Sequence, residues 1–88
     1  MEITLKLFAS LGDYLPHEHN GRQRQDNELP VDLPEGTTVQ AVIDEFRLPP
    51  RMAHLVCVNG VFIPPSQRAT KQLVAGDALA IWPPVAGG

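Results

Sequence analysis

Apolar residues occupy every second position at the start of the chain, at Ile3, Leu5 and Leu7. This period-2 pattern predicts a half-buried strand. The stretch 8–15 that follows allows a short helical turn. A second short strand is predicted around residues 29–33, before a turn at 34–36 that contains proline and glycine.

The next apolar residues have helical spacing. They fall at positions i, i+3, i+4 and i+7, as Val39, Val42, Ile43 and Phe46. This spacing predicts one amphipathic helix. Threonines precede it and can cap its first turn, and Gln40 follows Thr37 by three residues. The helix is expected to end near Leu48, because Pro49 disfavours helical geometry in the residue before it.

The last part of the chain predicts a hairpin and a further strand. Asn59 and Gly60 join two apolar runs within residues 54–63. This pair accepts the positive φ angles of a type I′ turn, so the two runs are expected to be adjacent strands. A last strand is predicted over residues 76–82, between a Gly-Asp turn and the prolines at 83–84, which have no N–H for a sheet.

The predicted order of elements is strand, strand, helix and three strands. One helix and a mixed sheet of four or five strands can bury their apolar faces only against each other, which gives a two-layer α+β fold. A β-grasp over residues 1–88, as a single domain, matches this order. The polar segment 16–28 has almost no apolar residues, and it is expected to be an exposed, partly disordered loop.

Three aromatic side chains fall out of phase with the core positions of their strands: Phe8, Phe62 and Trp82. A helix on one face of the sheet leaves the other face uncovered, and these residues are expected to point to that face. Clustered exposed aromatics are typical of protein interfaces. We therefore predict a docking surface beside the end of the chain. The alternative is a bulge that shifts the strand phase and places one or more of them in the core.

Composition excludes several function classes. The 88 residues carry a formal net charge of −3, so the basic patch of a nucleic-acid binder is missing. The start of the chain has neither the basic residues nor the long apolar run of a signal peptide, and no stretch reaches the roughly 18 to 20 apolar residues of a membrane span. The sequence predicts a cytoplasmic protein that binds neither nucleic acid nor membrane.

Metal and thiol chemistry are not expected. His17 and His19 flank Glu18 in the polar segment and could form part of a metal site. A zinc site normally needs three or four protein ligands, and His54 is the only other histidine in the chain. The single cysteine, Cys57, lies in the middle of a predicted strand. A lone cysteine in such a place is typical of a small buried apolar residue rather than a nucleophile.

The chain ends on two prolines, two small residues and two glycines, at positions 83–88. We expect a flexible tail here. Glycines have no side chains, so such a segment can pass through a narrow channel and bring its backbone close to a reactive centre. The carboxylate of Gly88 is the only functional group at the tip. A carboxylate becomes an acyl donor once its oxygen is made a leaving group, and adenylation by a partner enzyme is the usual biological route.

The stretch LVAGDALAIWPPVAGG, residues 73–88, resembles the C-terminus of the MoaD/ThiS sulfur-carrier family, above all its molybdopterin synthase small subunits. The likeness also covers PEGTTV at 34–39 and VCVNG at 56–60. It implies a ubiquitin-like β-grasp that is not itself an enzyme. A ubiquitin-activating-type enzyme would adenylate Gly88, which would then become a thiocarboxylate that donates sulfur.

In the molybdenum cofactor pathway, the resemblance implies that the acceptor is precursor Z, a cyclic pyranopterin monophosphate, held by the large synthase subunit. The carrier itself would bind no cofactor, since the activating enzyme uses the ATP. The resemblance also implies roles for the residues named above. The docking surface would comprise Phe8, Phe62 and Trp82, and the segment that threads the partner's channel would comprise Val85, Ala86 and Gly87.

Other functions stay open at this point. VNGVFIPPSQ, residues 58–67, is similar to the thiamine branch, in which the partner is thiazole synthase and the acceptor is the thiazole precursor. A ubiquitin-like modifier would use the same adenylation but would end in an amide bond between Gly88 and a lysine. A plain binding module would undergo no reaction at Gly88.

Overall fold

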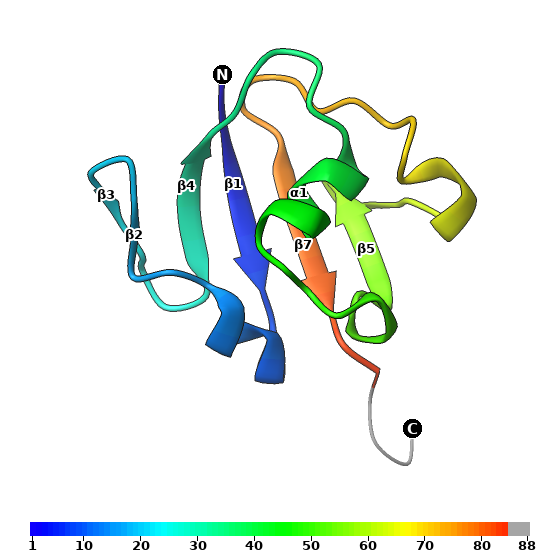
Figure 1. Ribbon diagram of the computed structural model, residues 1–88, viewed down its shortest axis with the longest axis horizontal. Coiled ribbons are helices and arrows are strands. Elements are labelled where there is room, and N and C mark those ends of the chain that lie inside the picture. Colours follow the sequence, from blue (N-terminus) through cyan, green and yellow to red (C-terminus); the bar gives the residue numbers. More distant parts are fainter. Residues whose placement is uncertain (85–88) are drawn as a thin grey trace.

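Five strands form a mixed sheet that carries one α-helix on one side, in the computed structural model, which describes residues 1–84. In chain order the strands are β1 (Glu2–Leu7), β4 (Glu28–Asp32), β5 (Leu55–Val58), β6 (Val61–Phe62) and β7 (Ala78–Trp82). Across the sheet their order is β4-β1-β7-β5-β6 (Figure 1). β1 runs parallel to β7, and the other neighbouring pairs are antiparallel. The predicted ubiquitin-like β-grasp is confirmed.

The helix α1 (Val39–Glu45) begins at a threonine cap. The Thr38 side-chain oxygen accepts the Ala41 N–H at 3.1 Å, which satisfies one free donor of the first turn. Thr37 instead donates its hydroxyl to a backbone carbonyl before the helix. Gln40 reaches forward to Asp44 at 3.0 Å and does not fold back on the cap. The threonine cap is therefore present, one residue later than the Thr37 and Gln40 spacing indicates.

The helix ends earlier than predicted. Its last residue is Glu45, and Arg47 adopts a φ of 57°, which right-handed helical geometry excludes. Leu48 returns to the core as a buried residue. Residues 1–84 also contain three short 3-10 helices, which are η1 (Ala9–Tyr14), η2 (Pro50–Met52) and η3 (Pro65–Gln67). None of the helices in residues 1–84 is long and apolar enough to cross a membrane.

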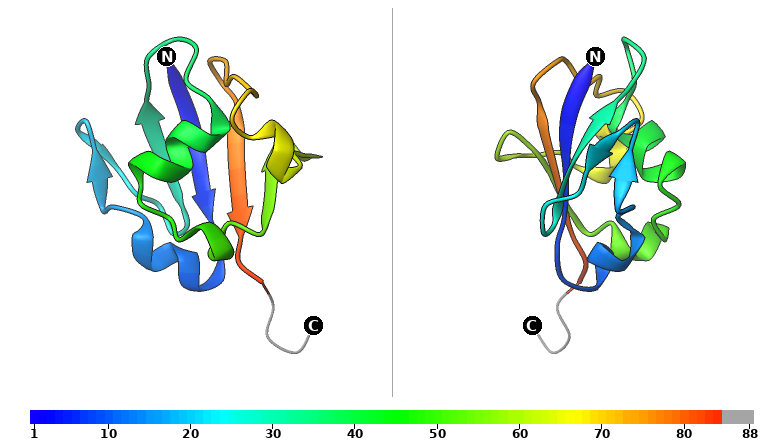
Figure 2. Two further views of the ribbon diagram at one scale, coloured as in Figure 1. Left: turned by 45° about the vertical axis from the view of Figure 1, so that its right-hand side comes forward. Right: turned by 90° about the vertical axis from the view of Figure 1, so that its left-hand side faces the viewer.

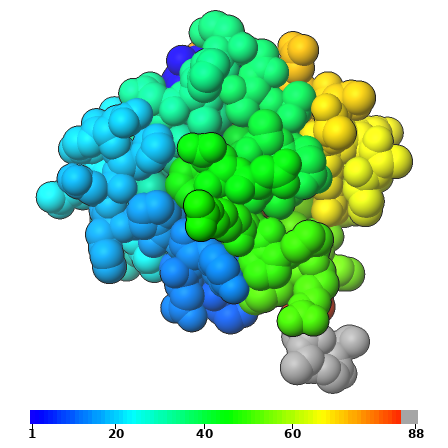
Figure 3. Space-filling model, viewed as in Figure 1, coloured from blue at the N-terminus to red at the C-terminus, as the bar shows by residue number. Residues whose placement is uncertain are grey.

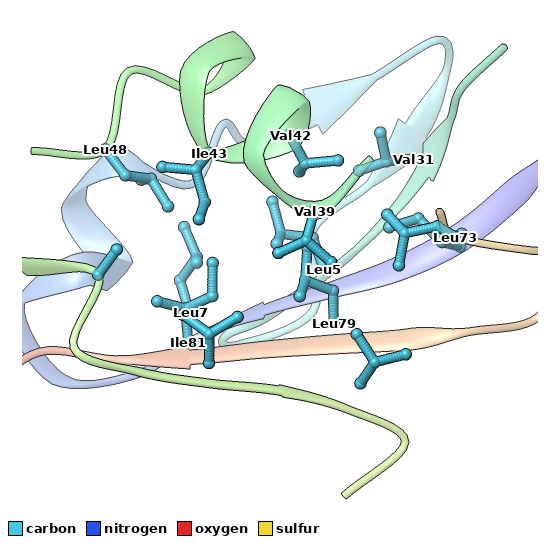
Figure 4. Close-up of a cluster of buried hydrophobic side chains, with 14 of the residues drawn as sticks. Leu5, Leu7, Val31, Val39, Val42, Ile43, Leu48, Leu73, Leu79 and Ile81 are labelled. Carbon is cyan, nitrogen blue, oxygen red and sulfur yellow. The ribbon is translucent and has the colours of Figure 1, made fainter. Parts of the chain in front are cut away.

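The core lies between α1 and the inner face of the sheet (Figure 4). The period-2 positions of the strands point inward and the apolar stripe of the helix points toward them, as the alternation predicts. Members from β1, β7 and α1 with at most 2% exposure are Ile3, Leu5, Leu7, Leu79, Ile81, Val39, Val42 and Ile43. Because both central strands contribute to this layer, the sheet and the helix are stabilised by one shared cluster.

The polar segment 16–28 is exposed over most of its length, but it is not a loop throughout. It contains an antiparallel hairpin of β2 (Glu18–His19) and β3 (Arg22–Gln23). Asn20 and Gly21 form its turn with φ angles of 49° and 79°, conformations that asparagine and glycine tolerate best.

Polar contacts hold this hairpin against the rest of the molecule. Arg24 donates from Nη1 to the carbonyls of Gly12 and Leu15, at 3.0 and 2.9 Å. The His19 ring lies against Phe46 at the end of α1, with 5.8 Å between ring centroids. The space-filling view of the side that carries α1 shows this helix in green, between the blue 16–28 segment and the yellow η3 region (Figure 3).

Candidate functional site

The outer face of the sheet, opposite α1, is the side without a helix in the described part of the chain (Figure 2). Half-buried or exposed apolar side chains gather on it at the β7, β5 and β6 strands and at the end of β1. We call this group the docking patch, and it comprises Phe8, Leu55, Cys57, Phe62, Ala80 and Trp82. A contiguous apolar surface of this kind is typical of a contact site.

Two of the predicted aromatics are in direct contact. The rings of Phe8 and Trp82 are stacked, with centroids 4.2 Å apart and an interplanar angle of 8°. The Phe8 N–H also donates to the Ile81 carbonyl at 3.1 Å, which holds the end of β1 beside the end of β7. Both rings remain only half-buried. The stack thus presents a rigid aromatic surface at the end of the two central strands.

The third aromatic, Phe62, lies at the edge of the patch and is 49% exposed. It pairs across β5 and β6 with Cys57, and Cys57 pairs in turn with Ala80 of β7. The structure therefore places all three aromatics on the outer face but brings only two of them together. Their role in binding a partner stays a prediction.

Cys57 does not lie in the core, contrary to our interpretation of the sequence. It is half-buried on the outer face, since its neighbours Val56 and Val58 take the inward positions of β5. Strand alternation permits only one of these two phases. The thiol is therefore part of the docking patch rather than of the hydrophobic core.

The remaining part of the outer face is polar. Lys6 of β1 lies beside Ala80, and on its other side it pairs with Glu28 of β4. Thr4 and Pro30 are the next outward pair on these strands, and Glu2 and Asp32, both exposed, are the pair after it. The outward-facing aromatic side chains are consequently confined to one half of the sheet, and the half that contains β4 has charged pairs at both ends.

The chain leaves the sheet beside the aromatic stack. Trp82 is the last residue of β7, where it pairs with Leu55 and accepts the His54 N–H at 3.1 Å. Pro83 is buried and Pro84 is exposed, so the chain stays packed one residue beyond the strand, within the span predicted as a flexible tail. The predicted reacting and threading residues lie outside the described residues: Val85, Ala86, Gly87 and Gly88.

Hydrogen bonds between the β5–β6 turn and the turn before β7 were not predicted from the sequence. Asn59 of the β5–β6 turn donates from Nδ2 to Asp77 Oδ1 at 2.9 Å, and its Oδ1 accepts the Ala78 N–H at 2.8 Å. Asp77 is buried and also accepts the Val74 N–H at 2.8 Å. These bonds tie the hairpin that carries Phe62 to the strand that carries Trp82. The Asn-Gly and Gly-Asp turn motifs were visible, but their contact is not a local feature.

A second missed residue is Arg68, which follows η3 and is only 6% exposed. Its guanidinium donates to three backbone carbonyls, those of Ile63, Ala53 and His54. Burial lowers the pKa of Arg68, because desolvation penalises the charged form. In the sequence it lies among polar residues, where an arginine is typical of an exposed position.

The three histidines do not form a site together. His17 and His54 are exposed, and His19 lies against Phe46. Across residues 1–84, no group of three or more His, Cys, Asp or Glu side chains is arranged to hold a metal ion.

The chain is similar to a known protein family and to a solved structure. A model of the ThiS family matches residues 18–88, which includes the hairpin, the docking patch on β5–β7 and the last glycine. The crystal structure of SAMP1 from Haloferax volcanii is similar over 100% of both chains, with 25% sequence identity and a TM-score of 0.65. No curated protein matches the chain.

Proposed function

This chain belongs to the ThiS family of MoaD/ThiS-like sulfur carriers, and on that premise we propose that it carries sulfur as a thiocarboxylate on Gly88. The family match extends through Gly88. Small carriers of this type are generally not enzymes, and they generally partner with E1-like adenylating enzymes and with synthases. The catalytic groups for each step therefore belong to the partners, and this chain supplies the reacting terminus and the surface that the partners hold.

The chemistry begins with the Gly88 carboxylate. An adenylating partner transfers AMP from ATP to this carboxylate and releases pyrophosphate, so that AMP becomes the leaving group. A sulfide-level sulfur donor then attacks the acyl carbon, the bond from this carbon to the AMP oxygen breaks, and Gly88 becomes a thiocarboxylate as AMP leaves. Gly87 and Gly88 have no side chains, so they allow the close backbone approach that a narrow active-site channel demands.

The observation that carries this proposal is the position of the docking patch at the exit of the chain. Trp82 is both half of the aromatic stack and the last residue of β7. An extended chain from Trp82 to Gly88 spans roughly 20 Å. A partner that binds the stack is therefore within that distance of the carboxylate on which it acts.

For the acceptor, we propose precursor Z of the molybdenum cofactor pathway, held by a molybdopterin synthase large subunit. The support is the resemblance of residues 73–88, and above all of the PPVAGG ending, to that branch. A second candidate is protein modification, in which Gly88 forms an amide with a lysine. It is favoured by the likeness to SAMP1, a ubiquitin-like small archaeal modifier, over the full length of both chains.

Intact mass spectrometry tests these proposals. The full chain is incubated with an adenylating enzyme of this type, ATP and a sulfur source. A carrier gains one sulfur atom in place of one oxygen atom at Gly88. A modifier appears joined to other chains through an amide bond. A chain that reacts in neither way, in the presence of an active partner, contradicts both proposals. Addition of precursor Z and the large subunit then tests the acceptor, with thiazole synthase as the alternative arm.

The length of the terminus gives the sharpest prediction. Removing Gly88, or adding one residue after it, is expected to abolish sulfur loading. One residue of extended chain moves the carboxylate by about 3.3 Å, which is as large as the roughly 3 to 3.5 Å near-attack distance itself. The thermal unfolding midpoint should stay unchanged, because the sheet ends at Trp82.

The matched control is Ser66→Ala, a change at an exposed position of η3, which should load as wild type does. Full loading of the lengthened chain, without cleavage back to Gly88, would contradict the role of Gly88.

A further inference from the structure

The geometry points to Arg68 as a positioning residue that fixes where the chain leaves the sheet, and we propose this role for it; the inference rests on the proposed function of Gly88. The hydrogen bonds of the Arg68 side chain go to Ile63, Ala53 and His54, none of which is part of the docking patch or of the exit after β7. It acts through the peptide group between Ala53 and His54, which lies between its guanidinium and Trp82.

Each of the three guanidinium nitrogens donates to a backbone carbonyl. Nε donates to Ile63 at 3.1 Å, Nη1 to Ala53 at 2.8 Å and Nη2 to His54 at 3.2 Å. None of the ion pairs within residues 1–84 includes Arg68. A planar fork with several donors is suited to holding adjacent carbonyls at fixed angles. The side chain therefore acts as a clamp on the residues that lead into β5.

Two hydrogen bonds at one peptide group connect Arg68 to Trp82. The Ala53 carbonyl, which accepts from Arg68, and the His54 N–H belong to the same peptide bond. In a trans peptide the two groups point in opposite directions. The His54 N–H accordingly points away from Arg68 and donates to the Trp82 carbonyl at 3.1 Å. Hydrogen bonds linked in this way polarise one another, so a charged donor at one end strengthens the bond at the other end.

The bond to Trp82 is the last of the ladder between β5 and β7. Pro83 and Pro84 follow and have no N–H to extend the ladder. Their rings also fix φ near −65°, so the chain direction that is set at Trp82 is carried into the two residues after it. A change at the Trp82 carbonyl therefore alters the direction in which the terminus leaves the sheet.

A purely structural role for Arg68 predicts a different result. It would lower the free energy of unfolding without changing the reaction of the folded protein. Arg24 provides the matched control, because it also donates to three backbone carbonyls, of Gly12, Leu15 and Asp26. Those bonds join η1 to the segment that follows β3, and none of them is part of a chain to β7.

The experiment compares Arg68→Met, Arg68→Lys and Arg24→Met in the full chain, below the unfolding midpoint of every variant. The first measurement is amide hydrogen exchange at His54, relative to Leu5 in the core. The second is kcat and KM for sulfur loading by the adenylating partner. Arg68→Met should lose about tenfold or more in kcat, with KM within about twofold, since a displacement of about 1 Å can cost far more than that. The His54 amide should exchange faster, while Leu5 changes only with global stability.

Arg68→Lys should fall between wild type and Arg68→Met, because an ammonium keeps the charge without the fork. Arg24→Met should change neither kcat nor the relative exchange of His54. If Arg68→Met does not fold, kcat and the relative exchange of His54 are compared between Arg68→Lys and Arg24→Met instead. Wild-type kcat in the Arg68 variants, or an equal loss in Arg24→Met, would overturn the inference. If wild-type protein itself is not loaded, the proposed function fails, and the His54 exchange alone then decides whether Arg68 holds the exit.

Discussion

The two sides of strand β7 differ in what they contact. Leu79 and Ile81 point toward α1 and are fully buried, whereas Ala80 and Trp82 point to the outer face and are half-buried. One five-residue strand thus contributes to the core on one side and to the docking patch on the other. Because successive side chains alternate between faces, stability and partner binding can be changed separately by choosing neighbouring positions.

The outer face also differs between its two halves. The docking patch lies over β5, β6 and β7, while β4 and most of β1 present charged or polar side chains such as Glu28 and Lys6. A partner that follows this division would cover the patch and leave the β4 edge in water. Charged rims around an apolar centre contribute more to partner choice than to affinity.

The largest expected effect is on the inner side. Leu79→Ala should lower the free energy of unfolding by about 2 to 5 kcal/mol, because it leaves a cavity in a fully buried layer. Denaturant unfolding measures this loss. The matched control is Ala80→Ser on the outer side of the same strand, which should change stability far less. Partner affinity of the folded Leu79→Ala protein should stay at the wild-type value. If the free energy of unfolding of Leu79→Ala equals that of wild type, Leu79 does not belong to the shared core cluster.

An intermediate effect is expected at the aromatic stack. Trp82→Ala should weaken binding of the adenylating partner about 30-fold, or about 2 kcal/mol, as for a central aromatic anchor. Loss of the stack on Phe8 should cost about 0.5 to 1.5 kcal/mol of folding stability beyond the buried area, less than a core truncation. Titration calorimetry and thermal unfolding measure the two quantities.

Tyr14→Ala is the control for Trp82→Ala, since Tyr14 is an exposed aromatic of η1 that is not part of the patch. It should leave affinity unchanged. A Trp82→Ala variant that binds its partner as wild type does, or that melts as far below wild type as Leu79→Ala, would place Trp82 outside the interface or inside the core.

Local rules predicted the elements well. The Asn59 and Gly60 turn has φ angles of 51° and 82°, as the sequence indicates, and the outward phase of Phe8 and Trp82 follows from strand alternation alone. Their stacking was not predictable in the same way. It requires β1 and β7, from opposite ends of the chain, to lie parallel and adjacent, which is a property of the topology.

The misses at Arg24, Arg68 and the segment 16–28 share one physical cause, which is that polar side chains form long-range contacts. Hydrophobic periodicity does not register an arginine that binds backbone carbonyls, so the contacts of Arg24 and Arg68 were not predicted. The segment 16–28 was accordingly predicted as a loop, whereas Arg24 and the contact between His19 and Phe46 hold a hairpin there. Such contacts depend on tertiary structure and not on sequence spacing.

The smallest expected effect is at the edge of the docking patch. Phe62 is 49% exposed on β6 and is separated from the aromatic stack by Cys57 and Ala80. Side chains at an interface rim usually contribute less than those at its centre, so Phe62→Ala should weaken partner binding by about 1 kcal/mol, or roughly fivefold.

Val61→Ala is the matched control for Phe62→Ala. Val61 is the neighbouring residue of the same strand, is 64% exposed, and pairs with the inward-facing Val58 rather than with Cys57. It should leave binding unchanged. Neither variant should lower the unfolding midpoint by more than a few degrees, because both side chains are exposed. If Phe62→Ala weakens binding more than Trp82→Ala does, the centre of the interface lies on the hairpin. The partner would then hold the β5–β6 hairpin, which the Asn59–Asp77 bond ties to β7, rather than the exit of the chain.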